Sequence, residues 1–141
     1  MSRIGCFVGA LGALLLTVTA SADWTVPPQN EVHLEGNGRS WFVRATLNGT
    51  MQGLFLLDTG ASYCVLTPAA ARRLGVGPST QEATVVTANG PVKASLIQLT
   101  SVDIGGNRAR DISAVVHNAV SPPLDGIIGL SYLNQIGRAH V

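Results

Sequence analysis

The chain has 141 residues and a formal net charge of +1, and charged side chains occupy only 12% of its positions. This length suits one domain, and a charge balance so close to neutral argues against a nucleic-acid-binding protein, which needs clustered Lys and Arg. Hydrophobic residues make up 46% of the chain, enough for a packed core, although part of them belongs to the N-terminal segment.

The first 22 residues have the composition of a secretory signal peptide. Arg3 precedes an apolar run from Ile4 to Val18, and Ala20-Ser21-Ala22 matches a cleavage site of small residues. The alternative is an uncleaved inner-membrane anchor, although the run is slightly short for a membrane span. Either interpretation predicts export, to the bacterial periplasm, to the medium or to the outer face of the inner membrane. Residues 23–30 contain a Pro-Pro pair and are predicted as a linker.

The first predicted elements are a strand and a hairpin. Glu31 to Glu35 alternates between polar and apolar residues, as a strand does. Ser40–Leu47 and Met51–Leu57 then flank Asn48-Gly49, a strong short-range hairpin signal. The second arm ends in four apolar residues directly before Asp58, which predicts a buried strand that presents an acid at its end.

A compact loop is predicted around this acid. Gly60 lets the chain fold back closely around the Asp58 carboxylate because glycine has no Cβ. Thr59 adds a hydroxyl that can hydrogen-bond within the turn or to a neighbouring chain. An ordinary Asx turn would explain the triplet taken alone, so its meaning depends on the rest of the sequence.

A strand and a short helix are predicted after the loop. Tyr63 to Leu66 fits a strand in which Cys64 is a small buried hydrophobe, because no basic neighbour is present to activate the thiol. Thr67 to Gly75 predicts a helix with a hydroxyl cap, a proline in its first turn and a glycine at its end.

Two further hairpins are predicted in the middle of the chain. Glu82–Thr87 and Val92–Leu99 flank a turn with Asn89-Gly90 at its tip. Val102–Ile104 is expected to pair with Ile112–His117 across a glycine-rich turn.

A second glycine motif follows these hairpins. After Asp125, the apolar pair Ile127-Ile128 leads to Gly129 and a short helix from Ser131 to Gln135. The segment around Ser131 approaches the elbow of serine hydrolases but lacks its last glycine, and the β-only pattern around it does not fit. Asp125 could be a second acid within one chain; we disfavour it because it precedes its apolar pair instead of following it.

In this order and spacing, Phe55-Leu56-Leu57-Asp58-Thr59-Gly60-Ala61-Ser62 and Ile127-Ile128-Gly129 resemble the retropepsin-like aspartic proteases, in their bacterial exported or membrane-tethered branch. The resemblance covers roughly Ser40 to Gln135. It implies an all-β fold: a closed, mostly antiparallel barrel with a flap hairpin and one or two short helices. The residues to which it gives roles are Asp58 as the catalytic acid, Thr59, Gly60, Ala61 and Ser62 as supports of its loop, and Ala88, Asn89 and Gly90 as the flap tip.

One Asp-Thr-Gly loop per chain raises a mechanistic problem. An acid protease needs one carboxylate as a base toward water and another as an acid toward the substrate carbonyl. We therefore expect a homodimer that places Asp58 of each subunit on a two-fold axis and cleaves a peptide or protein substrate. Because Ala61 brings no hydroxyl to the carboxylate, only a weakly acidic optimum is expected.

Other chemistries find little support in the sequence. The three histidines, His33, His117 and His140, lie far apart and show no metal-binding spacing, so neither a metal nor another cofactor is expected. The remaining alternative is a non-catalytic module of the cell envelope that uses the same fold for dimerisation or peptide binding.

The C-terminal end departs from the family pattern. Retropepsin-like domains continue into one more strand after the helix that follows the second glycine motif. Here only residues 136–141 follow Gln135, and they read as a non-native tail. We therefore expect a protease domain over residues 31–135 that lacks its last strand.

Overall fold

The computed structural model of the chain describes residues 32–77, 79–87 and 89–137, which form eight strands and two short helices. The strands are β1 (Glu35–Gly36), β2 (Trp41–Leu47), β3 (Met51–Leu57), β4 (Cys64–Leu66), β5 (Glu82–Thr87), β6 (Gly90–Ile104), β7 (Asn107–Val116) and β8 (Gly126–Ile128). The helices are α1 (Pro68–Leu74) and α2 (Leu130–Ile136).

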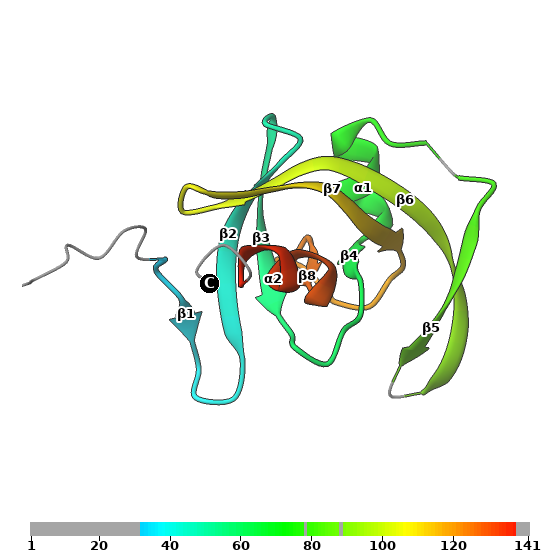
Figure 1. The fold of residues 1–141 in the computed structure, drawn as a ribbon. Helices are drawn as coiled ribbons and strands as arrows, with labels where there is room; N and C mark the ends of the chain where they lie inside the picture. Colours follow the sequence, from blue (N-terminus) through cyan, green and yellow to red (C-terminus); the bar gives the residue numbers. More distant parts are fainter. Residues whose placement is uncertain (1–31, 78, 88, 138–141) are drawn as a thin grey trace, which may run out of the picture.

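Six of these strands form a closed barrel (Figure 1). Their order is β2-β3-β8-β4-β7-β6, and an antiparallel pairing of Thr46 and Leu47 with Asp103 and Val102 joins β2 to β6 and closes the ring. Outside the ring, β1 pairs with β2 and β5 pairs with β6. Among the described strands, β3–β8 and β4–β7 are the parallel pairs. The prediction of an all-β, mostly antiparallel barrel is confirmed.

Strand alternation explains how the core forms. In β2, Val43, Ala45 and Leu47 are at most 3% exposed, while the residues between them are more exposed, so one face of the strand lies inside the barrel. This main core also takes in Phe55 of β3 and Tyr132 of α2. A separate small cluster lies where β4, β6, β7 and β8 meet. The buried members of the small cluster are Val65, Ala94, Val115 and Ile127.

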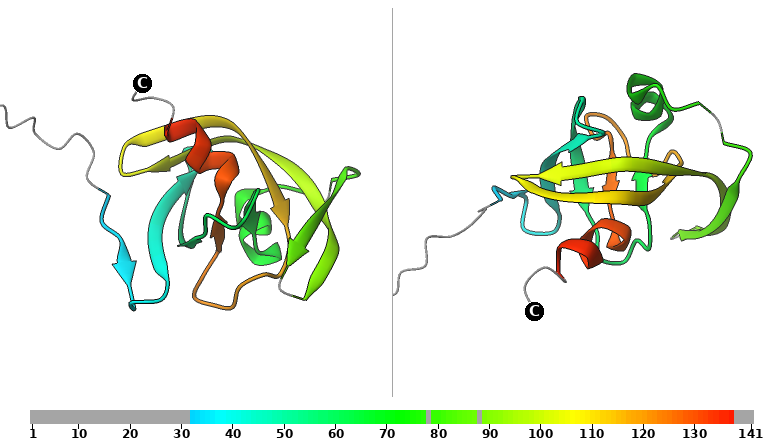
Figure 2. Two further views of the ribbon diagram at one scale, coloured as in Figure 1. Left: turned by 60° about the horizontal axis from the view of Figure 1, so that its bottom comes forward. Right: turned by 45° about the horizontal axis from the view of Figure 1, so that its top comes forward.

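Local signals produced the predicted turn and helices. Asn48 and Gly49 have φ values of 49° and 71°, the left-handed region that an Asn-Gly hairpin turn requires. Thr67 caps α1, because its Oγ1 accepts the N–H of Ala70 at 3.1 Å, and Gly75 ends the helix with φ 75°. Figure 2 shows α1 and α2 on opposite sides of the barrel. The first hairpin and both helices are therefore confirmed.

The predicted first strand and the predicted break in β6 were wrong. Among the described residues the first strand is reduced to β1, because only Glu35 and Gly36 pair with β2 before the chain turns at Asn37, whose Oδ1 accepts the N–H groups of Arg39 and Ser40. By contrast, β6 runs unbroken through 15 residues. It continues because its first part pairs with β5 and the rest pairs with β7.

The prediction that the strand before Asp58 is buried was wrong in part. Phe55 is 0% exposed, but Leu54, Leu56 and Leu57 are only half-buried. Leu56 lies on the face of β3 opposite Phe55, where it packs at the edge of the small cluster. Only one face of β3 therefore lies in the main core.

Some predicted segments lie outside the described residues. These are the signal peptide (1–22), the linker (23–30) and residues 138–141 of the suspected tail. Helix α2 extends one residue past the expected domain end at Gln135, and Ile136 packs against the main core. Within the described part of the chain, no helix has the length and apolar character needed to cross a membrane.

Candidate active site

Asp58 directly follows β3 and is half-buried. Parallel pairing places Leu57 opposite Ile128 of β8, and the Asp58 N–H donates to the Ile128 carbonyl at 3.0 Å. Its Oδ1 accepts the N–H of Gly60 at 2.8 Å. The backbone of the acid is thus anchored to the second glycine motif, and the turn orients its carboxylate.

Gly129 allows this motif to approach the acid loop (Asp58–Ser62) closely. The N–H of Leu130 donates to the Ala61 carbonyl at 2.8 Å. A Cβ on Gly129 would lie 2.6 Å from the same carbonyl oxygen and still closer to the Tyr63 carbonyl. Since neither backbone oxygen is free to move away, this approach requires glycine. The fold therefore joins two segments that the sequence analysis identified separately.

Ser131 forms a further link between the two segments. Its N–H donates to the Ser62 carbonyl at 3.0 Å, and its Oγ accepts the N–H of Cys64 at 2.9 Å. Cys64 is 1% exposed, and this burial raises the pKa of its thiol. Ser131 and Cys64 therefore contribute to the framework of the loop and do not present an activated nucleophile.

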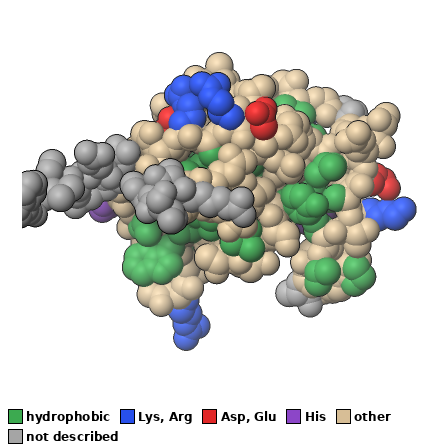
Figure 3. All heavy atoms as spheres, viewed as in Figure 1, with side chains coloured by type: hydrophobic (Ala, Val, Ile, Leu, Met, Phe, Trp, Pro, Cys, Tyr) green, Lys and Arg blue, Asp and Glu red, His purple; other side chains and the backbone are tan. Residues whose placement is uncertain are grey.

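A cavity of about 490 Å³ opens beside Asp58. The acid loop borders it on one side and the last residues of β5 border it on another, a size and shape that suit a ligand site. In Figure 3 a notch separates the β5–β6 hairpin from the body of the molecule. The lining residues are Asp58, Gly60, Ala61, Ser62, Tyr63, Val65, Thr84, Val85, Val86, Thr87, His117, Ala119 and Ile127.

The tip of the β5–β6 hairpin differs from the expected turn. Gly90 has φ 102° and pairs directly with Thr87 as the first residue of β6. Gly90 was expected at the tip, and this part of the prediction was wrong, because Gly90 already belongs to β6. Ala88 lies outside the described residues, and Asn89 is exposed.

Thr59 places a side-chain hydroxyl next to Asp58 in the acid loop. It is exposed, and within the described part of the chain its hydroxyl makes no hydrogen bond. Its hydroxyl is thus available to a group outside this chain.

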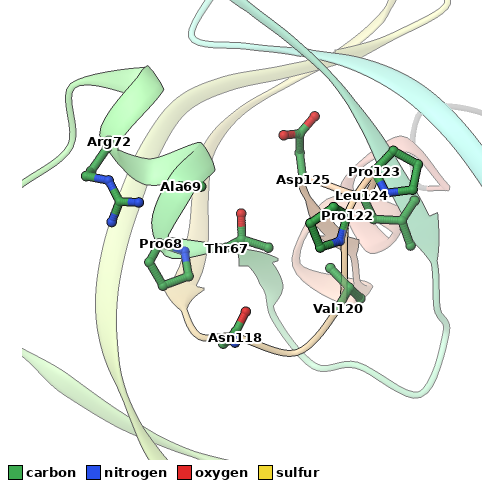
Figure 4. A pocket seen from close by; sticks show the side chains of 10 residues that line it. All are labelled: Thr67, Pro68, Ala69, Arg72, Asn118, Val120, Pro122, Pro123, Leu124 and Asp125. Carbon is green, nitrogen blue, oxygen red and sulfur yellow. The ribbon is translucent and has the colours of Figure 1, made fainter.

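Both carboxylate oxygens of Asp125 accept hydrogen bonds from other parts of the fold. Its Oδ1 accepts a hydrogen bond from Arg73 at 2.6 Å, and its Oδ2 accepts the N–H of Leu54 at 3.1 Å. Asp58 and Asp125 flank opposite ends of the β3–β8 pairing, roughly 13 Å apart at the usual rise of a strand. A second cavity, of about 390 Å³, is bordered by Asp125 and not by Asp58 (Figure 4). The two acids of one chain therefore do not form a catalytic pair.

His117 and the β5 residues that line the cavity were not predicted from the sequence as site residues. His117 comes directly after β7, and its N–H donates to the Leu66 carbonyl at 3.0 Å, which extends the β4–β7 pairing. The alternation Val115, Val116, His117 was a usable signal, because His117 shares a strand face with Val115. Among the described residues there is no group of three or more His, Cys, Asp or Glu side chains that could hold a metal ion.

Comparison with known proteins gives the family. The sequence model of a family described as aspartyl protease matches residues 43–132. The chain belongs to the aspartyl protease family. Within it, the chain is retropepsin-like, because a retropepsin-like aspartic protease from Rickettsia conorii shares its fold with a TM-score of 0.57 and 26% identity. That likeness covers 74% of this chain and 78% of the Rickettsia chain.

A curated relative is much longer. An "Uncharacterized protein in cobV 5'region" from a Sinorhizobium species is 37% identical to this chain over 84 residues. The similarity covers 57% of this chain and 35% of the relative, so the chain spans about a third of that protein's length. The region matched by the family model includes the acid loop, the β5–β6 hairpin and the second glycine motif.

Proposed function

We propose that this protein is an aspartic endopeptidase, in which Asp58 of each subunit of a homodimer supplies one of two catalytic carboxylates. One observation supports this most: Asp58 is held at the end of β3, beside a cavity of about 490 Å³ that β5 borders. Membership of the family supports peptidase chemistry in general. We propose the pairing of two subunits because residues 1–141 contain one acid loop and Asp125 lies far from it.

The proposed mechanism uses the two carboxylates in different protonation states. Two carboxylates about 3 Å apart share one proton, because both cannot be ionised at that distance. The ionised one removes a proton from the attacking water, and the protonated one donates to the carbonyl oxygen of the scissile bond. The exposed Thr59 hydroxyl would hydrogen-bond to the acid loop of the partner subunit.

We also propose the compartment in which the enzyme acts. The N-terminal segment predicts an exported enzyme that acts on peptides or proteins of the cell envelope. Membrane attachment is expected only if that segment stays uncleaved.

The experiment compares two Asp→Asn variants of the full chain with the wild type on a denatured protein substrate. Asp58→Asn should lower kcat/KM by roughly three orders of magnitude or more, because it removes the acid–base pair. Asp111→Asn is the matched control, since Asp111 is exposed and its φ of 52° is tolerated by Asn. Pepstatin should inhibit the wild type, and unchanged activity of Asp58→Asn would refute the proposal.

A mixing experiment tests the homodimer. Excess Asp58→Asn chain, added to a fixed amount of wild type, should suppress activity by drawing wild-type subunits into mixed dimers. Undiminished activity in the mixture would contradict a shared site. A wild type that dimerises or binds peptides without cleaving any of them would support the non-catalytic module instead.

The pH–rate profile tests the expectation from Ala61. The optimum should lie at weakly acidic pH, because no hydroxyl at this position stabilises the ionised carboxylate. A maximum at roughly pH 2 to 3, the acidic range of pepsin-type carboxylate pairs, would contradict it.

A further inference from the structure

We propose that His117 is a specificity-determining residue that selects peptides with a carboxylate side chain at the subsite between the β5–β6 hairpin and residues 117–119. The inference rests on the proposed function, because it names the substrate class of the same cavity. It rests on where His117 lies, on an imidazole that makes no hydrogen bond or ion pair within the described residues, and on the chemistry of the other residues around the cavity.

The strand geometry directs His117 toward the cavity. Val115 belongs to the small cluster, and its neighbour across the β4–β7 pairing, Val65, lines the cavity. The hydrogen bond from the His117 N–H to Leu66 continues this pairing, so His117 lies on the same face as Val115. His117 also lines the cavity itself and is half-buried there.

The imidazole of His117 is not used by the fold. Within the described residues it makes no hydrogen bond and no ion pair, although its backbone is fixed at both sides by hydrogen bonds to Leu66 and Ala119. An imidazole can always donate an N–H, and when protonated it also carries a positive charge. The backbone of His117 is thus held in place, and its polar ring is left for a ligand.

The lining of the cavity gives this ring a distinct role. Among the described residues that line the cavity, Asp58 is the one acidic side chain and His117 is the one side chain that can carry a positive charge. The nearby cation of the hairpin, Lys93, is exposed and paired with Glu82 at 3.5 Å. The remaining lining residues are apolar or carry hydroxyls. A substrate carboxylate that enters this cavity away from Asp58 therefore finds its cationic partner in His117.

The expected effect is a preference for acidic residues at one substrate position. A charge-assisted hydrogen bond in a partly desolvated site corresponds to about a tenfold gain over the neutral amide isostere. The test uses internally quenched peptide libraries that carry either Asp and Glu or Asn and Gln at one fixed position, scanned on both sides of the scissile bond. The assay is run at about pH 5.5, where a histidine side chain is ordinarily protonated.

His117→Gln and His117→Lys separate recognition from structure. The wild type should favour the acidic library about tenfold in kcat/KM at one position. His117→Gln should lose this preference, because its kcat/KM on the acidic library should fall about tenfold further than on the amide library, and His117→Lys should restore it. His33→Gln is the matched control, because His33 is exposed and does not line the cavity. An acidic preference that persists in His117→Gln, or an equal loss on both libraries, would overturn the proposal.

A binding measurement separates this inference from the proposed function. The Asp58→Asn chain is titrated with fluorescein-labelled versions of the same libraries, and fluorescence anisotropy reports their affinities. The double variant Asp58→Asn/His117→Gln is titrated in the same way. If the Asp58→Asn chain prefers the acidic peptides and the double variant does not, the inference is supported even if the wild type cleaves no peptide. Cleavage by the wild type with no preference in either assay sinks the inference and leaves the proposed function standing. Absence of both cleavage and preference refutes both.

Discussion

Tyr132→Phe removes a single hydroxyl and predicts a change in how stability depends on pH. Tyr132 lies in α2, is 1% exposed, and its Oη donates to the Asn107 carbonyl at 2.7 Å. Burial raises the pKa of Tyr132 to about 12, and the negative charges of Asp103 and Cys64 add to the shift. The variant keeps the ring and its packing, so it isolates this one group.

The sign follows from the raised pKa. As pH rises above about 10, the unfolded chain loses its tyrosine proton before the folded chain does, so the free energy of unfolding falls. The contribution of Tyr132 to the free energy of unfolding is fully present below about pH 10. It decreases by roughly 2–3 kcal/mol as the pH rises through about 12, at about 1.4 kcal/mol per pKa unit. At neutral pH the phenylalanine variant lacks only the hydrogen bond and should be about 1 kcal/mol less stable than the wild type.

Together these two terms predict that the stability curves cross. Below roughly pH 10.5 the wild type should be more stable, and above it the variant should be, because the variant has no tyrosine proton to lose at this site. Burial also raises the pKa of Cys64, so its thiol lowers the stability at high pH in both proteins alike and does not affect the difference between them. Urea unfolding followed by far-UV circular dichroism from about pH 7 to about pH 11.5 measures the difference. Parallel curves that never cross would refute the reasoning.

Two further predictions concern Asp125, the second acid near the β3–β8 pair, and the two Asn-Gly sequences of the chain. Asp125→Asn should lower the free energy of unfolding by about 1–2 kcal/mol, because its side chain is 18% exposed and bonds both Arg73 and Leu54, while Arg73 is 54% exposed and screened. Its folded fraction should cleave peptides at the wild-type rate, and loss of cleavage in a fully folded sample would show that Asp125 has a catalytic role. Asn89-Gly90 should deamidate in weakly alkaline buffer faster than Asn48-Gly49, because Asn89 is exposed while Oδ1 of Asn48 accepts two backbone N–H groups of β6. Peptide mapping by mass spectrometry that finds equal rates, or a faster reaction at Asn48, would refute this explanation.

The local elements were predictable because their causes lie within a few residues. Asn48-Gly49 formed its hairpin turn, and Thr67 and Gly75 delimited α1, since each acts through its own backbone angles or an adjacent N–H. Asp58 was likewise placed at a strand end by the apolar residues before it. The resemblance to retropepsin-like proteases then predicted the barrel.

The errors arose where pairing with distant strands decides the outcome. The break expected before Val102 disappeared because β7 pairs with β6 on both sides of it. The strand expected over Glu31–Glu35 had only Trp41 and Phe42 of β2 as partners and formed only two residues among those described. Gly90 was expected at the flap tip but belongs to β6, because it already pairs with Thr87.

The sequence by itself determined that Asp58 follows an apolar strand and is succeeded by a glycine turn, because these features depend on neighbouring residues. Tertiary structure alone decided what surrounds that acid. The parallel pairing of β3 with β8 bonds Asp58 to Ile128 and presses Gly129 against the acid loop, while β4–β7 pairing turns His117 toward the same cavity. Such contacts join residues far apart in the chain, so their register depends on how the whole barrel closes and not on any local propensity.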